Sequence, residues 1–259
     1  MDYCGVKYVI LLCTVTVISS YPSKQETTPP NPPPLHITDM GSGLDTIPEG
    51  HPQTKSVNFA YNHLTTLNDT IFTDKSYKAL HKIELFENKI SDISVTAFLG
   101  LKHLKIVDLS ENNITAINAY TFEFNTRLEK LDLGGNQISF KRESHFLVSY
   151  SLATLILRNN RIENIFAYNF VGVPKLKNLF LDYNIINYIE PNSFKPMNDL
   201  QYLSLAHTGV HKLSLSMFHD SPPRIIDLTD TILADKFEPP LRKVRNEAVG
   251  KLLTIDLYA

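Results

Sequence analysis

The chain has 259 residues, with 25 Lys and Arg against 27 Asp and Glu and a formal net charge of −2. This balance, with no basic block, gives no electrostatic support for nucleic-acid binding, so we expect no nucleic-acid partner. The length suits one or two ordinary domains, unless an internal repeat makes the chain one elongated array.

Residues 1–20 have the layout of a secretory signal peptide. Lys7 precedes an apolar run at residues 8–18, and Ser19 and Ser20 follow it. The run is too short to span a bilayer comfortably, so we expect cleavage after Ser20, with an uncleaved anchor as the alternative. No second run is long enough for a membrane helix. The expected product is secreted and extracellular, with no membrane span after cleavage.

Both cysteines, Cys4 and Cys13, lie in that segment, so the mature chain would have none. No disulfide would then brace its ends. Residues 21–34 contain six prolines, which favour an extended polyproline conformation. We predict a solvated linker here, and a Pro-rich recognition tail is the alternative.

A 24-residue repeat dominates residues 55–235. The unit from Leu104 to Ile117 reads LKIVDLSENNITAI, and similar text recurs one interval earlier and at three intervals later. A fixed period of roughly 20 to 29 residues with this text is the signature of a leucine-rich repeat. We count about eight units, some degraded. Phenylalanines keep the same step at Phe98, Phe122, Phe146, Phe170, Phe194 and Phe218.

The spacing within one unit predicts a short strand followed by a bend. Leu104, Val107 and Leu109 would point into a core, and Asp108 would face outward. Asn112 falls at the bend, where its amide can donate to and accept from backbone groups. Stacked units would align these amides as a structural ladder of Asn62, Asn88, Asn112, Asn136, Asn160 and Asn184. The predicted fold class is α/β, a leucine-rich-repeat solenoid (a curved horseshoe) with a parallel β-sheet on its concave face.

The repeat text resembles that of extracellular leucine-rich-repeat proteins, including Toll-type receptor ectodomains and secreted insect proteins, over roughly residues 35–259. Residues 35–54 are similar to the N-terminal cap of such proteins, since Leu44, Ile47 and Pro48 fit its LxxIP frame. The cysteines usual in that cap are missing. We expect the end of the core to be covered instead by Leu35, Ile37 and Met40.

The pattern changes toward the C-terminus. Thr208 replaces asparagine in the seventh unit, and a helix is expected to start near Pro239, with Leu241, Val244, Ala248 and Leu252 at helical spacing. Within residues 236–259 we predict this C-terminal helix and then a last repeat strand at 252–257. Such a strand would be an exposed sheet edge, which invites pairing with another chain. A terminal cap, a self-association edge and a truncated product remain as interpretations.

No catalytic or cofactor motif occurs, so we expect no enzyme activity and no cofactor. Glu84, Asp108 and Asp132 should form an acidic stripe across three neighbouring strands. A solvated face partly neutralised by lysines is favoured over acid–base chemistry there. His207 and His211 lie four residues apart on a bend rather than on a helix, and no metal site is expected.

Two sequons, at Asn68 and Asn113, are candidate glycosylation sites in a secreted chain. The residues that face outward on the concave sheet are not required by the fold. They are acidic in units two to four and become apolar and aromatic in units five to seven. Clustered aromatics beside an arginine resemble protein-binding hot spots. The candidate partner-binding residues are Ile156, Arg158, Phe180, Tyr183, Tyr202 and His207.

These features favour a secreted, non-enzymatic recognition protein that binds an extracellular protein ligand or receptor through its concave face. The resemblance to Toll-type ectodomains implies a role in innate immunity or as a soluble decoy of Toll-like signalling. The alternative is a structural, matrix or adhesion protein that associates with itself through the exposed terminal strand. An enzyme acting through Glu84 or Asp108 is the least supported hypothesis.

Overall fold

The computed structural model describes residues 33–218 and 222–254. All of the described residues belong to one compact unit of the chain. The predicted signal peptide and the predicted linker up to residue 32 therefore lie outside the described residues.

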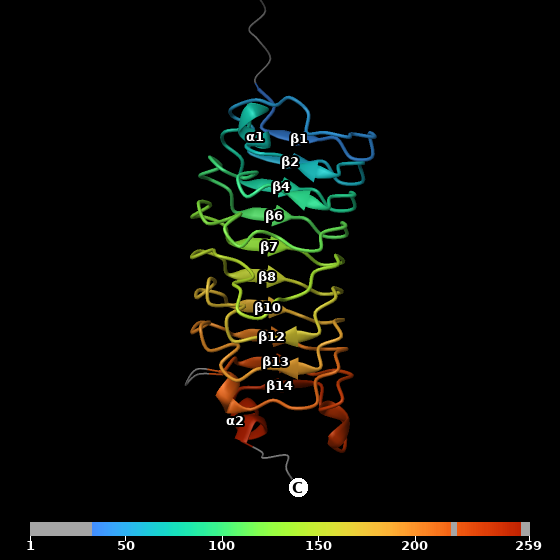
Figure 1. Ribbon diagram of the computed structural model, residues 1–259, viewed down its shortest axis with the longest axis vertical. Coiled ribbons are helices and arrows are strands. Elements are labelled where there is room, and N and C mark those ends of the chain that lie inside the picture. Colours follow the sequence, from blue (N-terminus) through green and yellow to red (C-terminus); the bar gives the residue numbers. More distant parts are fainter. Residues whose placement is uncertain (1–32, 219–221, 255–259) are drawn as a thin grey trace, which may run out of the picture. The chain divides into compact units, whose positions relative to one another are not determined.

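Ten short strands form the main sheet of the described chain, and each pairs with the strand of the next repeat (Figure 1). All pairs are parallel except the last, in which β13 and β14 are antiparallel. This arrangement confirms the predicted solenoid with a parallel sheet. In spatial order the strands are β1 (His36–Thr38), β2 (Ser56–Asn58), β4 (Lys82–Glu84), β6 (Ile106–Asp108), β7 (Lys130–Asp132), β8 (Thr154–Ile156), β10 (Asn178–Phe180), β12 (Tyr202–Ser204), β13 (Ile225–Asp227) and β14 (Lys243–Arg245).

Each three-residue strand turns its middle side chain into the core. Val107 of β6 is fully buried, whereas Ile106 and Asp108 on either side of it are half-buried. The register places Val107 between Ile83 and Leu131 of the neighbouring strands. Because side chains alternate along a strand, one buried column runs through the sheet. It consists of Val57, Ile83, Val107, Leu131, Leu155, Leu179, Leu203, Ile226 and Val244.

Buried asparagines join each repeat to the one before it. The Nδ2 of Asn112 donates to the carbonyl oxygens of Leu85 (3.0 Å) and Leu109 (3.1 Å), and its Oδ1 accepts from the Ile90 N–H (2.9 Å). One amide thus satisfies buried backbone groups of two repeats, which would otherwise be costly to bury. The same pattern holds at Asn62, Asn88, Asn136, Asn160 and Asn184. In the next two units Thr208 and Thr231 donate only to the carbonyl three residues earlier.

The residue before each ladder position has a left-handed backbone. Glu111 has φ 51° and Gly135 has φ 65°, and equivalent residues in the other repeats share this conformation. It lets the chain turn out of the strand, and the Glu111 N–H then donates to the Gly134 carbonyl of the next repeat (2.8 Å). The side chains of this column stand beside the sheet at the surface, and they include Tyr61, Glu87, Glu111, Asn159, Tyr183, His207 and Asp230.

Stacked phenylalanines fill the side of the core opposite the sheet. Phe98 stacks on Phe122 with ring centroids 4.7 Å apart, and Phe194 lies between Phe170 and Phe218 in the same way. The predicted step at Phe146 departs from this stack. Its ring packs on Phe140 (5.0 Å), and Phe140 rather than Phe146 contacts Phe170 (5.5 Å).

The segments that connect the strands are mostly turns, so the described chain contains little helix. Two pairs of short strands lie beside the main sheet, and four short helical segments occur. The paired strands are β3 (Thr66–Leu67) with β5 (Asp92–Ile93), and β9 (Asn164–Ile165) with β11 (Tyr188–Ile189). The helical segments are α1 (Ile71–Asp74), η1 (Leu215–Met217), η2 (Ala234–Lys236) and α2 (Glu247–Thr254).

The C-terminal region differs from the prediction. Lys243–Arg245 forms strand β14, where a helix was expected, and α2 begins four residues after the start of that strand. Val244 was counted on the apolar face of the predicted helix, but it faces inward opposite Ile226. Val249 and Leu252 supply the buried face of α2, so residues 252–254 are helical rather than the start of a strand. The remainder of the predicted last strand lies outside the described residues.

This correction changes the predicted sheet edge. The strand β13 has no free edge toward the C-terminus, because β14 pairs with it in the antiparallel direction. Antiparallel pairing lets the chain reverse and cover the edge of β13, so that β14 becomes the last strand of the described sheet. The self-association edge predicted at residues 252–257 is therefore wrong for its first three residues.

Candidate binding surface

The outward residues of the main sheet form one continuous surface, here named the open face. It consists of the residues on either side of each buried strand centre together with the left-handed column, and it corresponds to the predicted concave face. The register aligns the residue after each strand centre in one row: Asn58, Glu84, Asp108, Asp132, Ile156, Phe180, Ser204 and Asp227. The row changes from acidic to apolar between β7 and β8.

The acidic half of this row is partly neutralised and partly buried. Lys82 forms an ion pair with Glu84 at 2.8 Å. Burial raises the pKa of Asp132, and the neighbouring Asp108 charge raises it further. The Oδ1 of Asp132 accepts a hydrogen bond from the Gly134 N–H (3.1 Å), which anchors it to its own turn. These carboxylates are engaged with the fold, which does not suit them to acid–base chemistry on a substrate.

The apolar half contains a hollow of 430 Å³ between β10, β12 and β13. The rings of Phe180 and Tyr202 form one wall, with centroids 5.1 Å apart. Ile225 stands opposite Tyr202 on the next strand, so the apolar surface continues across three repeats. Polar groups complete the lining: Asn178, Gln201 and Arg224.

Asp227 fixes the tyrosine wall of this hollow. Its Oδ2 accepts a hydrogen bond from the Tyr202 hydroxyl (3.3 Å) and forms an ion pair with Lys243 of β14 (3.2 Å). Its Oδ1 accepts from the Thr229 hydroxyl (2.7 Å). Burial opposes ionisation of Asp227, but the bonds from Thr229 and Lys243 outweigh it and lower the pKa of this carboxyl. Burial and the Asp227 charge raise the pKa of Tyr202.

A second aromatic pair lies in the left-handed column. Tyr183 is 56% exposed, and its ring stacks on that of His207 with centroids 4.2 Å apart and an angle of 14°. The Nδ1 of His207 lies 3.2 Å from Asp230 Oδ2 of the next repeat. The positive φ of both aromatic residues, 56° and 54°, aligns their rings. An exposed, prestacked pair of this kind offers a flat contact surface at small entropic cost.

The six predicted partner-binding residues thus separate into three groups. Phe180 and Tyr202 line the hollow, with Ile156 buried beside Phe180 on β8. Tyr183 and His207 form the stacked pair. Arg158 is exposed but lies over Gly134, away from the hollow.

Sequence reasoning missed four residues of the hollow. Asn178 and Ile225 occupy outward strand positions, whereas Gln201 and Arg224 directly precede β12 and β13. Three of the four are polar, and a search for apolar and aromatic residues passed over those three. The register of the seventh and eighth units could have found them. Metal binding has no support in the described chain, where no group of three His, Cys, Asp or Glu residues could hold an ion.

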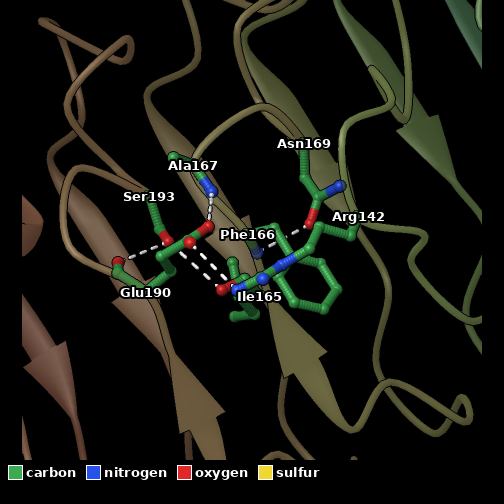
Figure 2. A network of polar contacts seen from close by, with 7 residues as sticks. All are labelled: Arg142, Ile165, Phe166, Ala167, Asn169, Glu190 and Ser193. Atoms are coloured by element: carbon green, nitrogen blue, oxygen red, sulfur yellow. Dashed lines mark hydrogen bonds and ion pairs between the residues drawn. The ribbon is translucent and has the colours of Figure 1, made fainter.

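A polar network on the side of the solenoid braces neighbouring repeats (Figure 2). Glu190 uses both oxygens, one for Arg142 Nη2 (3.1 Å) and one for the Ala167 N–H (2.9 Å). The Arg142 guanidinium also lies over the Phe166 ring, 5.2 Å from its centroid. Ser193 donates to the Glu190 carbonyl (2.6 Å). These groups satisfy one another and connect the irregular repeat at residues 139–150 to the two that follow.

Both sequon asparagines are exposed. Asn68 lines a shallow hollow beside β3 and β5, and Asn113 follows the ladder residue Asn112 on the turn. Each side chain is therefore accessible, which glycosylation would require. Among the described residues, no helix is long and apolar enough to cross a membrane.

Comparison with known proteins supports the repeat assignment. The family described as Leucine rich repeat matches residues 78–138 and 151–210. Tsukushi from Gallus gallus is 32% identical over 78 residues, which are 30% of this chain and 21% of that protein. The crystal structure of a TLR13–ssRNA13 complex matches with a TM-score of 0.52 and 21% identity, covering 76% of this chain and 31% of that chain.

This chain therefore spans about a fifth of Tsukushi and about a third of the TLR13 chain. At 21% identity the TLR13 match shows the fold alone. The repeat text, the parallel sheet with its asparagine ladder and the family matches over residues 78–138 and 151–210 show that the chain contains leucine-rich repeats, which form a solenoid similar in fold to the TLR13 chain.

Proposed function

We propose that this chain is a secreted, non-enzymatic recognition protein that binds a protein partner through the C-terminal half of its open face. The observation that carries the proposal is the hollow lined by Phe180, Tyr202 and Ile225, beside the stacked pair of Tyr183 and His207. The fold needs none of these side chains, because the buried strand centres and the ladder supply its core. Surface aromatics of this kind are enriched at the anchors of protein interfaces.

The layout of residues 1–20 supports secretion, and the resemblance to Toll-type ectodomains supports a role in innate immunity or as a soluble decoy. The TLR13 structure contains single-stranded RNA. For this chain we favour a protein ligand, because its net charge is −2 and the open face carries an acidic row.

The alternative of a matrix protein assembling through residues 252–257 loses the support of its first three residues, and β14 becomes the last strand of the described sheet. Residues 252–254 are helical, and β14 covers the edge of β13. We therefore propose recognition rather than assembly.

Affinity capture tests this function. The protein secreted from cultured cells is the bait in extracellular fluid of its own source, beside a double variant, Phe180→Arg with Tyr183→Ala. A matched control variant is Tyr168→Ala, which removes an exposed tyrosine from outside the open face. A partner retained by the parent and the control but lost by the folded double variant supports the proposal. Equal capture by all three, or self-association only, contradicts it.

A further inference from the structure

We propose that the hollow of the open face selects an acidic peptide segment that carries an apolar anchor side chain. This inference rests on the proposed function and names the chemistry of the partner. The occupant would insert one apolar side chain between Phe180, Tyr202 and Ile225, and its flanking carboxylates would meet the cations at the rim. The volume of 430 Å³ falls within the range of roughly 300–1,000 Å³ found for ligand pockets.

The cations around the hollow are the first support. Arg224 lines it directly, and Arg245 stands opposite Ile225 on β14. Lys177 directly precedes β10, and its carbonyl accepts hydrogen bonds from the Gln201 and Tyr202 N–H groups at the edge of the hollow. Within the described chain, none of Arg224, Arg245 and Lys177 forms an ion pair. All three side chains are exposed, so an incoming carboxylate can reach them.

The carboxylate of Asp227, beside the hollow, is already engaged, which is the second support. Asp227 is only 6% exposed and is held by Lys243, Thr229 and the Tyr202 hydroxyl. It cannot also neutralise Arg224 or Arg245 without giving up these contacts. Asp227 therefore leaves the charges of Arg224 and Arg245 unpaired, in contrast to the acidic row of β4, β6 and β7 on the same face.

Two amide side chains at the hollow add hydrogen-bond donors that favour an acidic peptide. Asn178 donates to the Thr154 hydroxyl (3.2 Å), which orients it at the wall of the hollow. Gln201 is exposed beside it and can donate to a carboxylate or to a peptide carbonyl. An arginine guanidinium can bind a carboxylate through two parallel hydrogen bonds. The hollow thus combines an apolar wall with amide donors and unpaired guanidinium groups. This lining suits a peptide segment with an apolar side chain between acidic residues better than it suits a neutral or a basic segment.

Fluorescence anisotropy with three labelled synthetic peptides tests this inference. The acidic probe is Gly-Asp-Glu-Leu-Glu-Asp-Gly, the second replaces its acids with Asn and Gln, and the third replaces its Leu with Gly. We expect the acidic probe to bind the full chain about tenfold more tightly than either other peptide, since charge-assisted bonds and the apolar anchor each contribute. Its affinity should fall as salt is raised.

Variants assign the effect to the rim. Combined Arg224→Glu and Arg245→Glu should reduce binding of the acidic probe to the level of the amide probe. Arg161→Glu is the matched control, because it changes an exposed arginine beyond the ladder residue Asn160 and should leave binding unchanged. Equal affinity for the acidic and amide probes, retained binding by the charge-reversed variant, or no binding of any probe to the parent would overturn the inference.

The capture experiment separates failure of this inference from failure of the proposed function. A partner lost by the Phe180→Arg variant but retained by the charge-reversed variant leaves open-face recognition standing and refutes the acidic ligand. A partner retained by both variants refutes both proposals.

Discussion

Replacing one asparagine of the ladder should lower the free energy of unfolding by a large amount for a single substitution. In the parent, Asn136 Oδ1 accepts from the Ile114 N–H (3.0 Å), and its Nδ2 donates to the carbonyls of Leu109 and Leu133 (both 3.0 Å). Asn136 is 7% exposed, so water has little access to these groups. The Nδ2 also donates to the Gly134 carbonyl (3.2 Å), so Asn136→Ala changes the hydrogen bonding of four backbone groups in two repeats.

The size of the loss in Asn136→Ala depends on which hydrogen bonds each backbone group keeps in the variant. The Leu109 and Leu133 carbonyls keep a second amide donor, from Asn112 and Asn160 respectively. The Ile114 N–H loses the acceptor that Asn136 provides. An orphaned buried donor costs about 1–3 kcal/mol. Adding the weakened carbonyl bonds and the lost packing, we expect the free energy of unfolding to fall by about 2–4 kcal/mol.

Urea unfolding followed by circular dichroism measures this loss. Asn136→Thr should cost less than Asn136→Ala, because threonine can keep the bond to the carbonyl three residues earlier, as Thr208 does at 2.6 Å. Asn198→Ala is the control, since that asparagine is exposed outside the ladder. An Asn136→Ala loss no greater than that of the control would refute the account of the ladder. Cooperativity should be checked in each variant, because repeat arrays can unfold in parts.

Three further predictions concern buried charge, close packing and the wall of the hollow. Folding raises the pKa of Asp132, so its contribution to stability is fully present below its unfolded pKa and is lost as pH rises through its folded pKa. The Asp132→Asn variant should therefore be more stable than the parent at pH 7, and the difference in thermal melts should be smaller at pH 4. At Gly172 an added Cβ would lie 2.2 Å from the Leu147 carbonyl oxygen, so Gly172→Ala should lower the free energy of unfolding by about 2 kcal/mol or more in urea titrations. Asp227 has a lowered pKa, so its stabilising effect is present above its unfolded pKa and disappears as pH falls through the folded one. The Asp227→Asn variant should accordingly differ most from the parent at neutral pH, and should also loosen the Tyr202 ring in NMR spectra.

The repeat could be predicted from the sequence because its signal is redundant. Every unit has the same inward positions, so a position assigned wrongly in one unit can be corrected by comparison with the neighbouring units. The register that aligns Asp108 with Asp132 and Ile156 with Phe180 follows directly from the 24-residue step. The break at Phe146 could not be predicted, because Phe140 takes its place in the stack through a change in the irregular repeat.

The C-terminal error has a different physical cause. Val244, Ala248 and Leu252 fit a helical period by spacing alone, whereas the open edge of β13 favours pairing at Lys243–Arg245. Tertiary context of this kind overrides local propensity. The site was found only in part for a similar reason. Their aromatic side chains marked Phe180 and Tyr202, but the polar lining at Arg224 is found only when the register of the seventh and eighth units is compared.

The central claim is that the C-terminal half of the open face binds a protein partner. Hydrogen–deuterium exchange of the protein with and without its captured partner tests it most directly. The account predicts slower exchange upon binding in peptides that contain the exposed turns at Tyr183 and His207 and the strands beside them, with little change around β3 and β5. Protection confined to the side sheets or to the acidic strands β4 and β6, with none at β10 and β12, would contradict it.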